Sequence, residues 1–216
     1  MTLEFDIHSA ALLVIDFQQD FLQGGVLQTV GASDALLRAE RVLAVARAAE
    51  IPIIHTREVH REQMVDFGRE LDGAEPVHCL ENHPGTDFHP ALYPIGGEFT
   101  LDKRRYSAFF ATDLDLLLRG LKVDTLIMMG TLTNVCVHYT AVDAHQHDYF
   151  FYIIEDCCVS SDWNAHWSAL KAMEYLQQKA RITHSDFVSS VTNLKLAPCI
   201  VGAASEELKP LDSPIT

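Results

Sequence analysis

A strand, a tight turn and a helix follow one another in the stretch DTLIMMGTLTNVCVHYTAVDAH, residues 124–145. The apolar run at 124–129 predicts a buried strand, and a helical pattern covers about 136–147. Cys136 lies where the helix opens, so its thiol feels the positive end of the helix dipole, which favours the thiolate. Backbone N–H groups at such a turn can bind a developing oxyanion. We therefore interpret Cys136 as a nucleophile rather than as a small buried residue.

Apolar runs and helical patterns alternate along the rest of the chain. We predict strands near 10–15, 51–55, 98–102, 124–129, 149–154 and 180–183, with helices at 33–50, 112–120, 136–147 and 163–178 and a helical turn at 186–191. This alternation predicts an α/β protein with a parallel sheet covered by helices on both faces. The 216 residues suit one domain, assigned to 1–192. Residues 193–216 are predicted to form a tail that packs on the domain or on a partner subunit.

Charged residues end two other predicted strands. Asp16 follows the wholly apolar run at 10–15, and Lys103 follows the strand at 98–102. Because the carboxyl ends of parallel strands meet at one edge of a sheet, where ligands bind, we expect both to lie near Cys136. Taken singly, Asp16 could be a helix cap, and Lys103 could belong to a solvated run with Arg104 and Arg105. Together with a thiol they form an acid–base and nucleophile set.

Three motifs resemble the isochorismatase-like cysteine hydrolases, which include nicotinamidases and N-carbamoylsarcosine, ureidoacrylate, biuret and triuret hydrolases. The motifs are LLVIDFQQDFL at 12–22, KRRYSAFFATDL at 103–114 and GTLTNVCV at 130–137, within a resemblance that runs from about 9 to 191. The resemblance implies a Rossmann-like three-layer α/β/α fold with a six-stranded, mainly parallel sheet. It implies a catalytic triad of Asp16, Lys103 and Cys136, and a non-proline cis peptide in the oxyanion turn, by position at Leu132–Thr133.

The resemblance implies a hydrolase that cleaves a carbon–nitrogen bond of a linear amide through a thioester, with no cofactor. TREVH at 56–60, YSAFF at 106–110 and EDCC at 155–158 look most like enzymes of ureido and carbamoyl amides. The expected substrate is therefore of the biuret, triuret, ureidoacrylate or N-carbamoyl amino acid type. Candidate substrate contacts are Phe17, Gln18, Phe21, Arg57, Glu58, Phe110 and Gln178, with Gln177 as an alternative to the last.

The long connection at 57–95 raises the question of a metal, since metal-dependent nicotinamidases carry Asp-x-His and further histidines near this place. This chain has Glu58-x-His60, with His78 and His83 later, and no set of three ligands at clear short spacing. We expect no metal. If one binds, these four residues are the candidate ligands.

The composition limits the kinds of partner and the location that we expect for the protein. A net charge of −14 argues against nucleic acid and anionic membranes, and no apolar run is long enough to span a bilayer. Five widely spaced cysteines predict reduced thiols and a cytoplasmic location. The resemblance implies a homo-oligomer, a dimer or a tetramer. The alternatives are a nicotinamidase, an isochorismatase (whose vinyl-ether chemistry needs no thiol), a non-catalytic binding protein on this scaffold, or a thiol redox protein using Cys157 and Cys158.

Overall fold

The apolar run at 10–15 forms the strand β1 inside a six-stranded sheet in the computed structural model, which describes residues 5–27, 29–73 and 75–196. The strands are β1 Ala10–Ile15, β2 Ile53–Glu58, β3 Phe99–Lys103, β4 Thr125–Thr131, β5 Phe150–Val159 and β6 Arg181–Ile182. Their order is β3-β2-β1-β4-β5-β6, and every neighbouring pair is parallel. The predicted α/β fold is confirmed.

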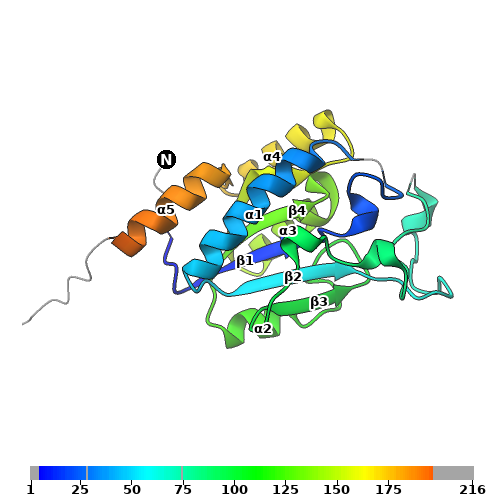
Figure 1. Cartoon of the computed structure of the whole chain (residues 1–216), viewed down its shortest axis with the longest axis horizontal. Coiled ribbons are helices and arrows are strands. Elements are labelled where there is room, and N and C mark those ends of the chain that lie inside the picture. Colours follow the sequence, from blue (N-terminus) through cyan, green and yellow to red (C-terminus); the bar gives the residue numbers. More distant parts are fainter. Residues whose placement is uncertain (1–4, 28, 74, 197–216) are drawn as a thin grey trace, which may run out of the picture.

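Helices cover both faces of this sheet (Figure 1). They are α1 Ala32–Ala48, α2 Leu114–Gly120, α3 His138–Gln146, α4 Trp163–Leu176 and α5 His184–Leu196, with short 3₁₀ turns η1 Gln19–Phe21, η2 Glu70–Asp72, η3 Pro84–Thr86 and η4 Pro90–Leu92 and one π turn, η5 Thr133–Val137. Among the described residues no helix combines the length and apolar character that crossing a bilayer demands.

Alternating side chains of β1 divide the core into two halves. Ala10, Leu12 and Val14 pack with α1 and α5, whereas Ala11, Leu13 and Ile15 pack with α2, α3 and α4. Both halves are buried, which explains why the run is apolar throughout instead of alternating with polar residues.

Four strands, β2 to β5, extend beyond their predicted ends, and this matters for the site. β2 continues to Glu58 because β3 pairs with it to the end, Arg57 opposite Asp102 and Glu58 opposite Lys103. β4 continues to Thr131, opposite Val159 at the end of β5.

The start of the first helix and the start of the predicted tail also differ from the prediction. The helix α1 is capped by Gly31 instead of Ser33. The predicted tail at 193–216 begins inside α5, and its part from 197 on lies outside the described residues.

The sheet order reverses direction between β1 and β4. Connections run outward from β1 through β2 to β3, and then outward from β4 through β5 to β6. In open parallel sheets the crevice at such a switch point, beyond the carboxyl ends of the strands, is where ligands bind. The ends of β1 and β4 therefore mark the expected site.

Candidate active site

Asp16 directly follows β1 and is fully buried. Its backbone has a positive φ of 49°, a left-handed conformation that Asp tolerates better than most residues. The carboxylate accepts a hydrogen bond of 2.7 Å from the hydroxyl of Thr56, and the hydroxyl of Thr131 donates to its carbonyl oxygen. Neighbours on β2 and β4 thus fix this carboxylate, which is no helix cap.

Lys103, the last residue of β3, carries its ammonium group into the middle of the site. Its Nζ lies 2.7 Å from an oxygen of Asp16, 2.9 Å from an oxygen of Glu58 and 3.4 Å from the sulfur of Cys136. The side chain is buried. Burial alone would lower its pKa, but Asp16, Cys136 and Glu58 outweigh that effect and raise the pKa of Lys103 well above its usual range. Lys103 is therefore charged in the resting protein.

The π turn η5 carries Cys136 immediately after β4. The turn approaches β1 closely, because a Cβ atom on Gly130 would lie 2.2 Å from the carbonyl oxygen of Ile15, and Gly130 has a φ of 156°. Thr133 anchors the turn by donating to the carbonyl of Val159. The first N–H groups of a helical turn lack partners within it, so this turn can present donors to an oxyanion.

The cis peptide lies between Thr131 and Leu132, one residue earlier than the predicted Leu132–Thr133 bond. The difference follows from β4, which runs through Thr131 and leaves the turn to begin at once. Leu132 and Thr133 still form the start of the turn that leads to Cys136.

The environment of the sulfur differs from the thiolate expected at a helix start. Burial raises the pKa of the Cys136 thiol well above its usual range, Lys103 lowers it, and the carboxylates of Asp16 and Glu58 raise it further. Burial likewise raises the pKa of Asp16, although Lys103 opposes this. The resting sulfur is therefore a neutral thiol beside Asp16, Glu58 and Lys103, and the oxygens of Asp16 and Glu58 and the sulfur lie within 4.8 Å of one another.

This geometry can be set beside known proteins. A family model described as the Isochorismatase domain matches residues 10–186. The chain belongs to the isochorismatase family. Within it, the chain is 35% identical to the maleamate amidohydrolase of Pseudomonas putida over 68% of this chain and 70% of that protein. It is 32% identical to a ureidoacrylate amidohydrolase of Enterobacter sp. (68% and 74% covered), and 30% identical to the nicotinamidase of Escherichia coli (68% and 82% covered).

Solved structures agree with this placement. A cysteine hydrolase from Pseudomonas syringae superposes with a TM-score of 0.80 at 26% identity, covering 88% of this chain and 95% of that one. The pyrazinamidase of Pyrococcus horikoshii in complex with zinc superposes with a TM-score of 0.74 at 29% identity, covering 81% and 99%. The predictions of the family and of a hydrolase acting on carbon–nitrogen bonds are confirmed, and the chain is an isochorismatase-family amidohydrolase.

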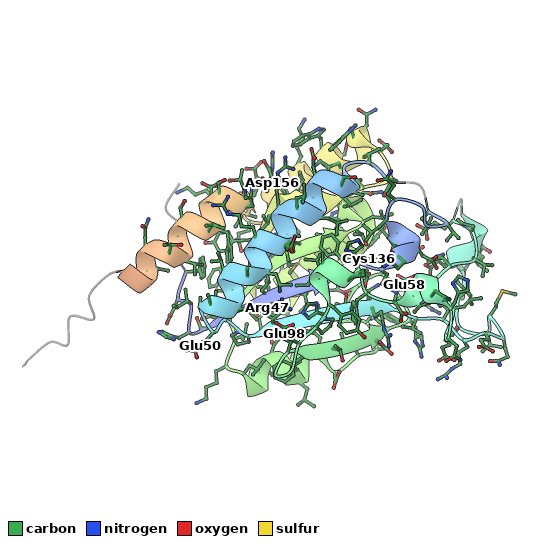
Figure 2. The ribbon with its side chains drawn as sticks, viewed as in Figure 1. Arg47, Glu50, Glu58, Glu98, Cys136 and Asp156 are labelled. Atoms are coloured by element: carbon green, nitrogen blue, oxygen red, sulfur yellow. The ribbon has the colours of Figure 1, made fainter. Side chains whose placement is uncertain are left out.

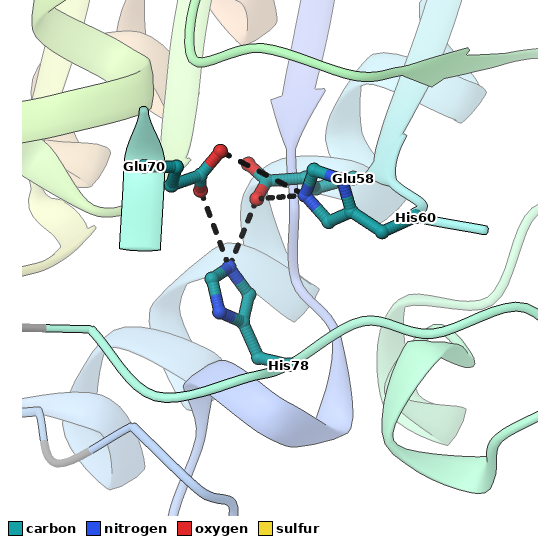
Figure 3. Close-up of side chains that lie close together, drawn as sticks. All are labelled: Glu58, His60, Glu70 and His78. Atoms are coloured by element: carbon teal, nitrogen blue, oxygen red, sulfur yellow. Dashed lines mark hydrogen bonds and ion pairs between the residues drawn. The ribbon is translucent and has the colours of Figure 1, made fainter. Parts of the chain in front are cut away.

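A second buried cluster adjoins the first through Glu58 (Figure 3). The other carboxylate oxygen of Glu58 lies 3.1 Å from Nε2 of His60 and 3.0 Å from Nε2 of His78. Glu70 completes the group at 3.4 Å from His78 and 3.8 Å from His60. Of the four ligand candidates expected from the sequence, Glu58, His60 and His78 therefore meet. His83 does not, because its ring accepts from the N–H of Gly85 outside the cluster.

The cluster fits a divalent cation in its donor set. One ligand atom from each of Glu58, His60, Glu70 and His78 lies within 4.8 Å of the others, and both oxygens of Glu70 are buried without a hydrogen-bond partner. Carboxylate and imidazole donors suit ions such as zinc, manganese and iron. Without a metal, a protonated His78 can neutralise part of the charge of Glu58 and Glu70. Burial alone would lower the pKa of His78, but Glu58 and Glu70 beside its Nε2 raise that pKa to about 10.

Three predicted substrate contacts are buried and have partners within the protein. Gln18 is fully buried: its amide donates to the carbonyls of Glu58 and Thr86, and its oxygen accepts from the N–H of Glu58. Phe17 is part of the core next to α1. Phe21 packs edge-on against His78, with ring centroids 5.5 Å apart, so it supports the buried cluster.

The structure pairs Arg57 with a neighbour and leaves Phe110 and Gln178 exposed. Strand alternation turns Arg57 to the side opposite Glu58, where it forms two hydrogen bonds with Asp102. Phe110 is 59% exposed on the segment after β3. Gln178 is exposed, and Gln177 hydrogen-bonds Phe151 at the amino end of β5, because α4 runs back toward the opposite edge of the sheet.

The sequence patterns do not single out Glu70, Glu75 or Tyr106, which the structure places near the thiol. The acidic residues belong to the long connection between β2 and β3, whose length was the one signal of a functional segment. Burial raises the pKa of Tyr106, and Glu70, Glu75, Glu58 and Cys136 raise it further, which reflects their closeness to its hydroxyl.

Proposed function

We propose that the protein is a cysteine-dependent amidohydrolase that cleaves a carbon–nitrogen bond of a small ureido or carbamoyl amide through a thioester. The observation that carries the proposal is the ammonium group of Lys103, which contacts Asp16 at 2.7 Å and Cys136 at 3.4 Å beyond the switch point of the sheet (Figure 2 labels Cys136 and Glu58). A carboxylate, a fixed cation and a thiol at one crevice are the parts that acyl transfer needs.

In the first half of the reaction, Asp16 takes the thiol proton as the sulfur of Cys136 attacks the substrate carbonyl. Backbone N–H groups of the turn at 132–136 stabilise the oxyanion, a contribution of about 10²–10³-fold per donor. Asp16 then gives the proton to the leaving nitrogen. The carbon–nitrogen bond breaks, ammonia or an amine departs, and the acyl group stays on the sulfur.

In the second half, Asp16 takes a proton from a water molecule that attacks the thioester. The carbon–sulfur bond breaks, the proton returns to the sulfur, and the acid product leaves. Proton transfer by a positioned group contributes about 10²–10⁴-fold. Lys103 opposes the effect of burial on the pKa of Asp16 and so favours its ionised form, and it compensates the negative charge that develops on the sulfur.

Glu58 has a supporting place in this scheme. Burial would raise its pKa, but Lys103, His60 and His78 hold it well below its usual range, so Glu58 stays ionised and helps to fix the lysine. A divalent cation held by Glu58, His60, Glu70 and His78 would supply a Lewis acid next to the pocket. The steps above use this chain's own residues alone.

Two observations support a small ureido or carbamoyl amide. The named relatives act on small amides, maleamate and nicotinamide among them, and one of the relatives acts on the ureido compound ureidoacrylate, as their names state. In addition, buried polar groups surround the thiol, and such a site discriminates strongly against substrates that leave those groups unpaired. A ureido group offers several N–H donors and a carbonyl acceptor in a short length.

The test compares kcat/KM for biuret, triuret, ureidoacrylate, N-carbamoylsarcosine, maleamate and nicotinamide, measured as ammonia or amine release. A ureido or carbamoyl compound is expected to lead, and Cys136→Ser is expected to abolish turnover. Cys158→Ser, a change of another buried thiol, serves as the matched control and should retain activity. Nicotinamide as the best substrate by a clear margin would move the assignment to a nicotinamidase, and an active Cys136→Ser variant would remove the nucleophile.

A further inference from the structure

A cavity of about 510 Å³ adjoins the turn that carries the thiol. Leu132, Asn134 and Val135 line it from the turn itself, and Tyr106 lines it from the segment after β3. The opposite part of the wall comes from the long connection and holds Glu70 and Glu75. Cys136 does not itself line the cavity, but its neighbours in the turn do, so the cavity can take the remote end of a substrate whose carbonyl reaches the thiol.

The charged residues of this wall are both acidic. Glu70 is 92% buried, being 8% exposed, and neither of its oxygens has a hydrogen-bond partner in the described structure. Glu75 is half-buried on the same wall. Among the described residues that line the cavity, none is Lys, Arg or His. The wall therefore presents acceptors and negative charge to whatever fills the cavity.

The cations nearest in sequence or space already have partners. Lys103 is shared by Asp16 and Glu58, at 2.7 and 2.9 Å. His78 lies 3.0 Å from Glu58 and 3.4 Å from Glu70.

The two arginines before Tyr106 are also engaged elsewhere. Arg104 pairs with Asp66 at 3.2 Å and with Glu81 at 3.3 Å. The guanidinium group of Arg105 donates to the backbone carbonyl of Asp66. A carboxylate in the cavity would thus meet like charges, and none of the described lining residues offers it a counter-ion.

We propose that the enzyme selects small amides whose end remote from the scissile carbonyl is uncharged or cationic, and rejects those that end in a carboxylate, with Glu75 and Glu70 as the specificity-determining residues. The inference rests on the proposed function and narrows it: compounds of the biuret and triuret type fit, whereas ureidoacrylate and N-carbamoyl amino acids do not. Juxtaposed like charges suppress wrong ligands, and an N–H or ammonium group would pair with the carboxylates of Glu75 and Glu70.

The test uses three ureido compounds of matched length that differ in terminal charge: N-carbamoylglycine, N-carbamoylglycinamide and N-(2-aminoethyl)urea. We expect kcat/KM for the uncharged and cationic compounds to exceed that for carbamoylglycine by about 10²-fold or more. Glu75→Gln should shrink this ratio by about tenfold. Glu50→Gln, on the opposite edge of the sheet (Figure 2), is the matched control and should leave the ratio unchanged.

A second measurement keeps the charge preference testable without turnover. Protection of Cys136 against iodoacetamide by the same compounds needs binding alone, so it gives the order of affinities even if no ureido compound is hydrolysed, the result that would defeat the proposed function. Both measurements are made on the protein as purified and after chelation. The proposal is overturned if carbamoylglycine leads or protects best in either preparation, or if Glu75→Gln leaves the ratio at its wild-type value.

Discussion

Replacing Glu58 with Gln should make Cys136 more acidic. Glu58 contributes a buried negative charge whose oxygen lies 3.6 Å from the sulfur, and this charge raises the pKa of the thiol. Gln keeps the size of the side chain and can still accept a hydrogen bond from an imidazole, but it removes the charge. Lys103 then faces Asp16 and the sulfur alone, so its positive charge acts more strongly on the thiolate.

The size of the effect follows from the distance. Two unit charges 3.6 Å apart interact by about 4.6 kcal/mol when the effective dielectric constant is about 20. That energy corresponds to about 3 pKa units. Relaxation of the neighbours reduces it, so we expect the midpoint of thiol alkylation to fall by about 1–3 pH units. Removing one partner of a buried ion pair also costs about 3–5 kcal/mol of stability.

The assay follows iodoacetamide labelling of Cys136 as a function of pH, with peptide mass mapping to identify the labelled thiol and far-UV circular dichroism to verify folding. Glu62→Gln, an exposed carboxylate in the same connection, is the matched control and should leave the midpoint unchanged. An unchanged or raised midpoint in a folded Glu58→Gln variant would refute the electrostatic reasoning.

Three further outcomes are expected. The pKa of His78 is raised from 6.5 to about 10, so its contribution to stability is complete below about pH 6.5 and is lost as the pH rises through 10. Urea unfolding should therefore show a steeper loss of stability between pH 7 and 10 in the wild type than in His78→Gln. Gly130→Ala should cost about 3 kcal/mol or more, since its Cβ would strike the carbonyl of Ile15, whereas Gly120→Ala, with open space around it, should stay within about 0.5 kcal/mol; equal costs would contradict the close approach. Exhaustive chelation should leave amidase activity intact, because Lys103 and His78 already pair with Glu58; loss of activity that one metal restores would show the reverse.

The sequence was sufficient to place Asp16, Lys103 and Cys136 at one edge, because each follows a recognisable strand and parallel strands end together. It was not sufficient for Glu58. Whether Arg57 or Glu58 faces the thiol depends on whether β2 continues to 58, since neighbouring side chains of a strand point to opposite faces. Polar residues at that position look like a loop, and the pairing with β3 that extends the strand is a non-local contact.

The acidic wall was harder to predict for a different reason. Glu70 and Glu75 lie in a connection without periodicity, where no pattern of apolar residues fixes which side chains turn inward. For Gln18 the difficulty is the reverse, because its position in the sequence suggested a role in the site. Its residue type and its place beside Asp16 suggest a substrate contact, whereas its amide is consumed by backbone groups of Glu58 and Thr86.

Those bonds of Gln18 have a consequence for how such an enzyme can diversify. The side-chain amide acts as a substitute peptide unit, holding the start and the later part of the long connection against the end of β1, and Asp20 adds a second anchor by accepting from the N–H of Cys79. The segment that carries Glu70 and Glu75 lies between these anchors in the sequence. Substitutions in this segment, natural or engineered, can therefore change substrate preference. Asp16, Lys103 and Cys136 keep their places, because the strands of the sheet hold them.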